Sequence, residues 1–221
     1  RAAQTGLRRG RTAGAPRGWT RIAPDLDARG HAVVAGLLTP AQCQALAAGY
    51  DNEHRYRTRI VMSPHGFGRG QYKYFAYPLP RLLHNLRTAL YPRLAPVANR
   101  WNRQMGIAVQ YPAEHAAFLA RCHQAGQRRP TPLILRYGAG EYNCLHQDLY
   151  GEHVFPLQVA VLLSRPDEDF TGGEFVMTET DSAGQRAEVL PLRQGDVLVF
   201  TVNQRPVAGA LTVRRSATRN G

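Results

Sequence analysis

The sequence predicts an α+β protein in which N-terminal helices support a set of antiparallel strands of jelly-roll type. Two observations carry this prediction: apolar residues recur at helical spacing before residue 130, and short β-rich runs separated by turn residues fill the chain from residue 132. Helices followed by antiparallel strands are typical of α+β folds. With 221 residues and 43% hydrophobic content, the chain can bury one core. We therefore expect one domain, with residues 19–130 as a helical region and residues 131–221 as a β core.

Capping residues and helical spacing mark the elements of the first half. His31–Val34 is an apolar run that predicts a short strand, and Thr39 followed by Pro40 is typical of a helix start. Gly49 is expected to end that helix. Two further helices are predicted from apolar residues at helical spacing, one from Leu79, Leu82, Leu83, Leu86 and Leu90 and the other from Ala116, Leu119 and Cys122.

Five β-rich runs predict the strands of the second half. They cover residues 132–137, 155–164, 173–178, 186–192 and 196–201. Turn residues punctuate them at Pro166-Asp167, Gly172-Gly173 and Gly195-Asp196. The second half of the chain is therefore expected to be all-β.

The formal charge of +12 is concentrated at the two ends of the chain. Residues 1–21 hold six arginines and residues 205–221 hold four, with no acidic residue in either segment, so the ends account for ten of the twelve net positive charges. Residues 1–18 contain few large apolar residues, and we expect them to be a disordered basic leader. Net charge alone is therefore weak support for a nucleic-acid groove.

Cysteine usage and hydropathy indicate a cytoplasmic chain. Cys43, Cys122 and Cys144 are odd in number and widely spaced, which fits a reducing compartment better than a disulfide framework. No apolar run approaches the roughly 18 residues of a membrane span, and the N-terminal arginines precede no signal-peptide core. We expect no membrane partner, and the sequence leaves the oligomeric state open.

An imidazole and a carboxylate stand two residues apart at His146 and Asp148. Because positions i and i+2 of an extended chain point the same way, both side chains could converge on one cation. Two histidines and one carboxylate that leave coordination sites open are the ligands of non-haem Fe(II) oxygenases. The pair would supply two of those three ligands, although an isolated His-x-Asp can also be a surface pair.

The ordered series around this pair resembles the 2-oxoglutarate and Fe(II)-dependent dioxygenases, in the branch with the prolyl-4-hydroxylase-like enzymes. The series runs from the Tyr137–Gly140 turn through His146 and Asp148 to Gly172–Phe175 and Pro191–Phe200. The resemblance implies a double-stranded β-helix in which His146 and Asp148 bind iron. It also implies that Tyr137 hydrogen-bonds 2-oxoglutarate, with a packed aromatic as the other reading. O2 and, as a candidate accessory factor, ascorbate complete the implied cofactors.

Residues 54–209 resemble more closely a bacterial oxygenase family described as repairing alkylated DNA, most visibly at His65–Gly70 and Leu145–Gly151. That resemblance implies a dioxygenase for oxidative dealkylation, which hydroxylates the N-alkyl group of a damaged base in DNA or RNA so that the group leaves as an aldehyde. Because one fold hosts many substrates, a protein side chain such as proline is the alternative target.

Basic and aromatic residues alternate between Arg55 and Phe75, a combination that binds a phosphate backbone and stacks an unpaired base. Arg59, Arg69, Tyr72 and Lys73 are the candidate substrate-binding residues, which would make this part of residues 19–130 face the substrate. The alternative is a strand in which Tyr72, Tyr74 and Phe75 pack on the core while the basic residues are solvated. The sequence leaves both readings open.

The C-terminal segment departs from the resemblance. Dioxygenases of this superfamily carry a distal histidine on a late strand and then an arginine that binds 2-oxoglutarate, but the last histidine here is His153. We expect residues 208–221 to be an Arg-rich tail without a strand, as in a truncated chain, so that Arg214 and Arg215 are not held in place. Both late strands, with the third iron ligand and the cosubstrate arginine, would then be missing.

Two alternatives to an active iron enzyme follow from that departure. One is a catalytically silent domain that binds nucleic acid or a partner. The other is a closed zinc site formed by His146, Asp148 and His153, although the short connection favours His153 as a loop residue at the mouth of the site.

Overall fold

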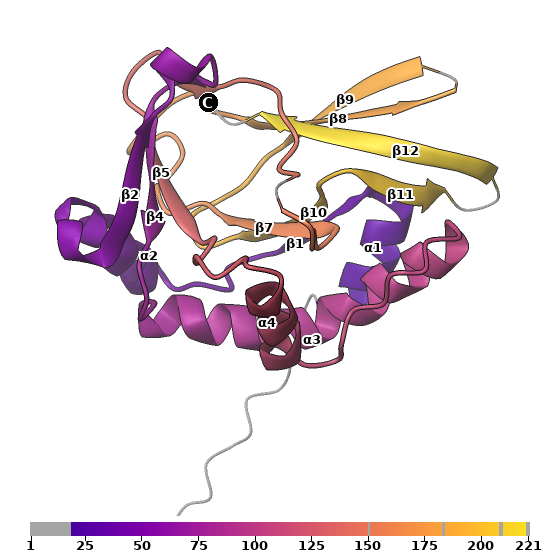
Figure 1. Ribbon diagram of the computed structural model, residues 1–221. Coiled ribbons are helices and arrows are strands. Elements are labelled where there is room, and N and C mark those ends of the chain that lie inside the picture. Colours follow the sequence, from indigo (N-terminus) through magenta and orange to yellow (C-terminus); the bar gives the residue numbers. More distant parts are fainter. Residues whose placement is uncertain (1–18, 150, 183, 208–209, 220–221) are drawn as a thin grey trace, which may run out of the picture.

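The computed structural model describes residues 19–149, 151–182, 184–207 and 210–219 of the 221-residue chain, the last range as backbone only. These residues combine helices with antiparallel sheets, which confirms the predicted mixture of helix and antiparallel strand (Figure 1). The predicted leader, residues 1–18, lies outside the described residues. In the described part of the chain, no helix is both long and apolar enough for a membrane span.

The helices lie mainly in the first half, as predicted. They are α1 (Ile22–Arg29), α2 (Pro40–Ala48), α3 (Arg81–Gln104) and α4 (His115–Gln124), with 3-10 turns at Trp19–Arg21, Gly49–Asp51, Glu53–Arg55 and Ser63–His65. Thr39 caps α2 reciprocally with Gln42, since its Oγ1 accepts from Gln42 N at 3.3 Å and Gln42 Oε1 accepts from Thr39 N at 2.9 Å. The predicted helices α2, α3 and α4 are therefore confirmed.

Two helices differ from the sequence prediction. Helix α1 was not predicted, because it is short, carries Pro24 in its first turn and buries only Ile22 and Leu26. Helix α3 continues beyond Leu90 to Gln104 through Pro92 and Pro96. Each proline removes a backbone hydrogen bond from the helix, but a buried apolar face that includes Trp101 continues on both sides of them.

Within the described ranges, the strands form four antiparallel sheets. They are β1 (His31–Val34), β2 (Tyr56–Val61), β3 (Gly68–Arg69), β4 (Gln71–Phe75), β5 (Leu133–Arg136), β6 (Tyr142–Asn143), β7 (Leu157–Val161), β8 (Phe175–Asp181), β9 (Gly184–Leu190), β10 (Val197–Thr201), β11 (Gln204–Val207) and β12 (Ala210–Arg219). The sheet orders are β1-β10-β7, β11-β12-β8-β9, β2-β4-β5 and β3-β6. The five predicted runs correspond to β5, β7, β8, β9 and β10, and the predicted strand at His31–Val34 is β1.

The principal core lies between helix α3 and the β1-β10-β7 sheet, and α3 runs along the underside of that sheet (Figure 1). Leu94, Val97 and Trp101 of α3 belong to one buried cluster with Val34 of β1 and Val199 of β10. Strand β10 is buried at all five positions, which accounts for its continuous apolar sequence.

The expectation of a strandless tail is wrong. Strand β12 pairs with β8 from Arg215 opposite Thr180 to Arg219 opposite Val176, and on its other edge it pairs with β11. Strands β8 and β11 thus provide the backbone hydrogen bonds of a segment whose sequence pattern is not typical of a strand. Such partners are distant in sequence, so the local pattern does not reveal them. Arg214 and Arg215 therefore lie on a strand.

Candidate metal centre and its surroundings

His146 and Asp148 converge as the sequence predicted. They follow β6, and Nε2 of His146 lies 3.6 Å from Oδ1 of Asp148. Their side chains are 31% and 33% exposed, so solvent reaches both side chains.

Each member of the pair is oriented by a further contact. Nδ1 of His146 lies 2.8 Å from the carbonyl oxygen of Cys144, which can only accept, so Nδ1 carries a proton and Nε2 is the ring nitrogen that faces Asp148. Nε2 of Gln158 donates to Oδ2 of Asp148 at 2.9 Å, which leaves Oδ1 facing the histidine.

Gln158 was missed by the sequence reasoning. It lies on β7, and β7 brings it to a carboxylate ten residues earlier in the chain. The available signal was a polar residue inside an apolar strand run, between Leu157 and Val159.

The electrostatics of the pair favour the charged carboxylate. The pKa of His146 is raised because the carboxylate of Asp148 lies beside it, while burial acts in the opposite direction. Burial is the largest influence on Asp148 and would raise its pKa, but hydrogen bonding to His146 and Gln158 outweighs it and the pKa is lowered. Asp148 is thus held as an anionic oxygen donor.

This donor set fits two positions of an Fe(II) shell. Atoms 3.6 Å apart can both lie about 2.1 Å from one divalent cation. Among the described residues, no group of three His, Cys, Asp or Glu side chains could hold a metal ion, so His153 does not complete a closed zinc site with the pair. Instead, the backbone N of His153 donates to Oε1 of Gln127 at 2.9 Å.

Tyr137 directly follows β5 and packs beside the turn between β3 and β4. Its side chain is half-buried, and a Cβ added to Gly70 would lie only 2.7 Å from its Cδ1 atom. Gly70 has a φ of +128°, so both its conformation and its missing side chain allow this close approach. This packing against Gly70 fits the reading of Tyr137 as a packed aromatic residue. A hydrogen bond from Tyr137 to 2-oxoglutarate stays a proposal.

The candidate substrate-binding residues separate into two groups. Arg59 and Arg69 are exposed on β2 and β3, and Nε of Arg59 donates to Oε1 of Gln71 at 2.7 Å. Tyr72 is half-buried on β4, with its ring 5.5 Å from that of Tyr74 in an edge-on arrangement. These three residues stay candidates, but they do not share one face of the sheet: Arg59 pairs with Lys73, so its side chain lies on the opposite face from that of Tyr72.

Lys73 lies in the other group, because it is only 2% exposed. Its Nζ donates to the carbonyl oxygen of Tyr50 at 2.9 Å and to Oε1 of Glu53 at 2.6 Å, and it lies 4.4 Å from the centre of the Tyr50 ring. We therefore remove Lys73 from the candidate surface. The alternative reading holds in part: the stretch is a strand and Phe75 lies in the core, but Tyr72 and Tyr74 are only half-buried and Lys73 is not solvated.

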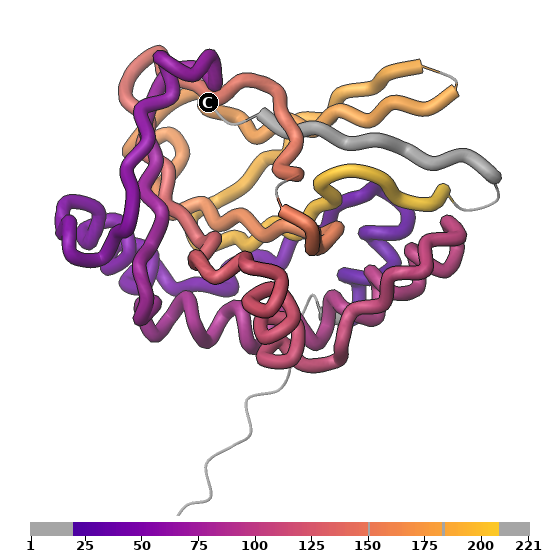
Figure 2. Tube along the Cα trace, in the orientation of Figure 1, coloured from indigo at the N-terminus to yellow at the C-terminus, as the bar shows by residue number. Residues whose placement is uncertain are grey.

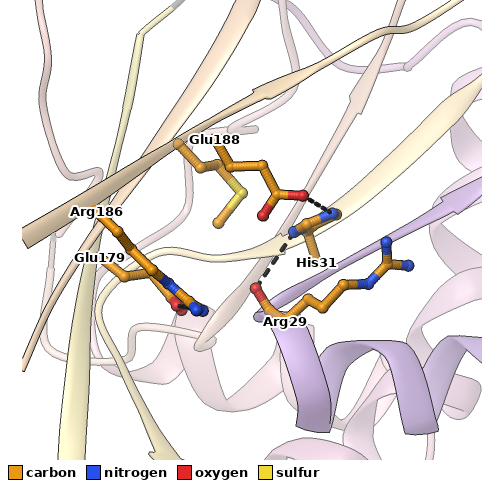
Figure 3. A pocket seen from close by; sticks show the side chains of 6 residues that line it. Arg29, His31, Glu179, Arg186 and Glu188 are labelled. Atoms are coloured by element: carbon orange, nitrogen blue, oxygen red, sulfur yellow. Dashed lines mark hydrogen bonds and ion pairs between the residues drawn. The ribbon is translucent and has the colours of Figure 1, made fainter.

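A second polar cluster joins α1 and β1 to strands β8 and β9 (Figure 3), and Arg205 of β11 contacts the same Glu179. Arg205 donates from Nε to Oε1 of Glu179 at 2.7 Å and from Nη2 to Oε2 at 3.0 Å, and from Nη1 to the carbonyl oxygen of Asp27 at 2.9 Å. The side chains of Arg205 and Glu179 are 1% and 5% exposed. This contact links segments far apart in sequence, indigo α1 and yellow β11, which lie side by side in Figure 2.

An oxygenase family and two mycobacterial proteins are similar to this chain. A family model described as "Oxygenase, catalysing oxidative methylation of damaged DNA" matches residues 70–221. The uncharacterized proteins MT2286 and Rv2227, from two strains of Mycobacterium tuberculosis, are each 45% identical over 148 residues, 66% of this chain. The chain spans 64% of the length of these curated relatives.

Among solved structures, a Pseudomonas putida prolyl-4-hydroxylase superposes on this chain with a TM-score of 0.52. The superposition covers 91% of this chain and 97% of the hydroxylase chain. At 12% identity, this similarity shows a likeness of fold alone. Together with the family match, it confirms the resemblance predicted from the sequence.

Proposed function

The chain belongs to this oxygenase family, and on that premise we propose that it acts as an Fe(II)- and 2-oxoglutarate-dependent dioxygenase built on a double-stranded β-helix. The single observation that carries the proposal is the convergence of His146 and Asp148, both about a third exposed and both oriented by a further hydrogen bond. A pair of this kind is the protein part of an open coordination shell.

In the proposed site, Nε2 of His146 and Oδ1 of Asp148 hold the iron. Bound Fe(II), with 2-oxoglutarate and O2, supplies oxidation of a C–H bond with succinate and CO2 as co-products. The residues of this chain then bind and orient: Gln158 fixes the carboxylate, the Cys144 carbonyl fixes the imidazole, and Tyr137 hydrogen-bonds the cosubstrate.

The proposed substrate is an N-alkylated base in nucleic acid, and the reaction is oxidative dealkylation. The family description names damaged DNA. Arg59 and Arg69 supply exposed cations for phosphates, and Tyr72 lies on β4, opposite Ile60 of β2. A base inside a duplex is out of reach of such a site, so the substrate is single-stranded or the target nucleotide is flipped out.

The test is succinate release by the purified protein with Fe(II), 2-oxoglutarate and O2. We expect release above the substrate-free level with oligonucleotides that carry N-methylated bases, and no increase with unmethylated oligonucleotides of the same sequence. Release stimulated by proline-containing peptides and not by oligonucleotides would replace the substrate with a protein side chain. No release with either substrate, despite folded protein, would favour a silent binding domain.

A further inference from the structure

We propose that the tip of the β2–β4 hairpin, residues 62–70, positions the substrate base, with the ring of Phe67 stacking on an unpaired base beside the His146–Asp148 pair. This inference rests on the proposed function and names one of its substrate contacts. Phe67 was not among the substrate-binding residues predicted from the sequence.

Backbone contacts tie the tip directly to the loop that carries the pair. Strand β3 pairs with β6 through Gly68 opposite Asn143 and Arg69 opposite Tyr142. The carbonyl oxygen of Phe67 then accepts from Cys144 N at 2.8 Å, and the carbonyl oxygen of Cys144 orients the imidazole of His146. The backbone of Phe67 is therefore one hydrogen bond away from the residue that fixes the proposed iron ligand.

Gly68 makes this close approach possible. It has a φ of +117°, and a Cβ at this position would lie 2.2 Å from the carbonyl oxygen of Tyr142 and 3.0 Å from Cys144 N. Both are backbone atoms that cannot move aside as a flexible side chain would. The tip and the loop of the pair thus form one unit, and the fully buried Met62 anchors the other side of the tip.

The side chains of the tip are suited to a nucleobase. Phe67 is 43% exposed, and its ring stacks on His65 at 5.4 Å with an interplanar angle of 22°. Leu145 and Leu149 on either side of the pair are also exposed apolar residues. Exposed Arg69 follows Phe67 by two residues. An aromatic face with an adjacent cation is the combination that binds an unpaired base and its phosphate.

The test measures binding of a fluorescent single-stranded oligonucleotide carrying an N-methylated base. We expect Phe67→Ala to weaken the affinity by about 5- to 100-fold, in keeping with the loss of one base–aromatic stack, and Phe67→Trp to retain it. Tyr77→Ala is the matched control, since Tyr77 is 45% exposed and follows the opposite end of β4 from the tip. Its affinity should equal that of the wild type.

The Fe(II) affinity, measured without nucleic acid, distinguishes a lost substrate contact from misfolding. The Fe(II) affinity of Phe67→Ala should be unchanged while the KM for the oligonucleotide rises. Equal oligonucleotide affinity of Phe67→Ala and wild type, in a wild type that turns over oligonucleotides, would overturn this inference and leave the proposed function standing. A wild type that binds and turns over no oligonucleotide would overturn both.

Discussion

Two of the ion pairs among the described residues differ in what surrounds them. His146 and Asp148 lie 3.6 Å apart, about a third exposed, with one nitrogen and one oxygen facing each other. Arg205 and Glu179 are almost fully buried and make two parallel hydrogen bonds, and Arg186 and backbone carbonyls of α1 contact the same groups. The open pair retains donor atoms that a ligand can use, whereas the buried pair has its donor and acceptor capacity filled by the protein.

This difference assigns the two pairs to different tasks. A charge pair whose partners are all internal acts on the fold, since it joins β8 and β11 to the end of α1. A pair whose side chains are oriented by neighbouring residues and remain partly exposed can bind a ligand. Substitutions in the two pairs should therefore move different measured quantities, stability for one and metal binding for the other.

The largest effect is expected for Glu179→Gln. Removing one charge leaves Arg205 buried without its counter-ion, which costs roughly 3–5 kcal/mol of unfolding free energy. Chemical denaturation measures this cost. The double variant Glu179→Leu/Arg205→Met should lose less than the single variant, because it leaves no unpaired charge. A Glu179→Gln protein as stable as the wild type would contradict the structural role.

Gly30→Ala tests the same cluster from its backbone side. Gly30 has a φ of +75°, and a Cβ there would lie 2.7 Å from both Nε of Arg205 and Oε1 of Glu179. Backbone strain and overpacking together should cost about 2–5 kcal/mol. Gly36→Ala is the matched control, because its φ is +58° and no atom lies within 4 Å of the added Cβ, so only about 1–2 kcal/mol of strain is expected. Equal losses of stability in the two variants would show that the cluster tolerates the intrusion.

Gln158→Ala tests the open pair. Loss of a residue that orients a ligating carboxylate should weaken Fe(II) affinity by about 10- to 100-fold, measured by titration, with little change in the unfolding free energy. Gln185→Ala on exposed β9 is the control and should leave both quantities unchanged. A Gln158→Ala protein with wild-type iron affinity would show that Asp148 needs no such orientation.

The smallest expected effect is a decrease of the unfolding free energy at low pH. Burial would raise the pKa of Glu179, but hydrogen bonds from Arg205 and Arg186 outweigh burial and the pKa is lowered from 4.5. A lowered folded-state pKa contributes stability that is present above the unfolded value and lost as the pH falls through the folded value. The unfolding free energy should therefore decline below about pH 4.5, and Glu179→Gln should flatten that decline. Parallel pH profiles of the two proteins would refute this assignment.

The local sequence pattern predicted the structure correctly where residues close in sequence determine it. The period of two along an extended chain predicted that His146 and Asp148 converge, and a cap with a first-turn proline predicted the start of α2. Pattern failed where distant partners decide. Lys73 is buried because Tyr50 and Glu53 accept its hydrogen bonds, and β12 is a strand because β8 and β11 flank it. Gln158 reaches Asp148 only through the position of β7.

The central claim is that His146 and Asp148 form an iron-binding pair, and anaerobic Fe(II) titration of the purified protein tests it most directly. His146→Ala and Asp148→Ala are compared with the wild type, and Arg165→Ala, in a surface ion-pair network, serves as control. We predict weak iron binding by these 221 residues that both alanine substitutions abolish and the control retains. Iron binding that persists unchanged in both variants would contradict the assignment of the pair.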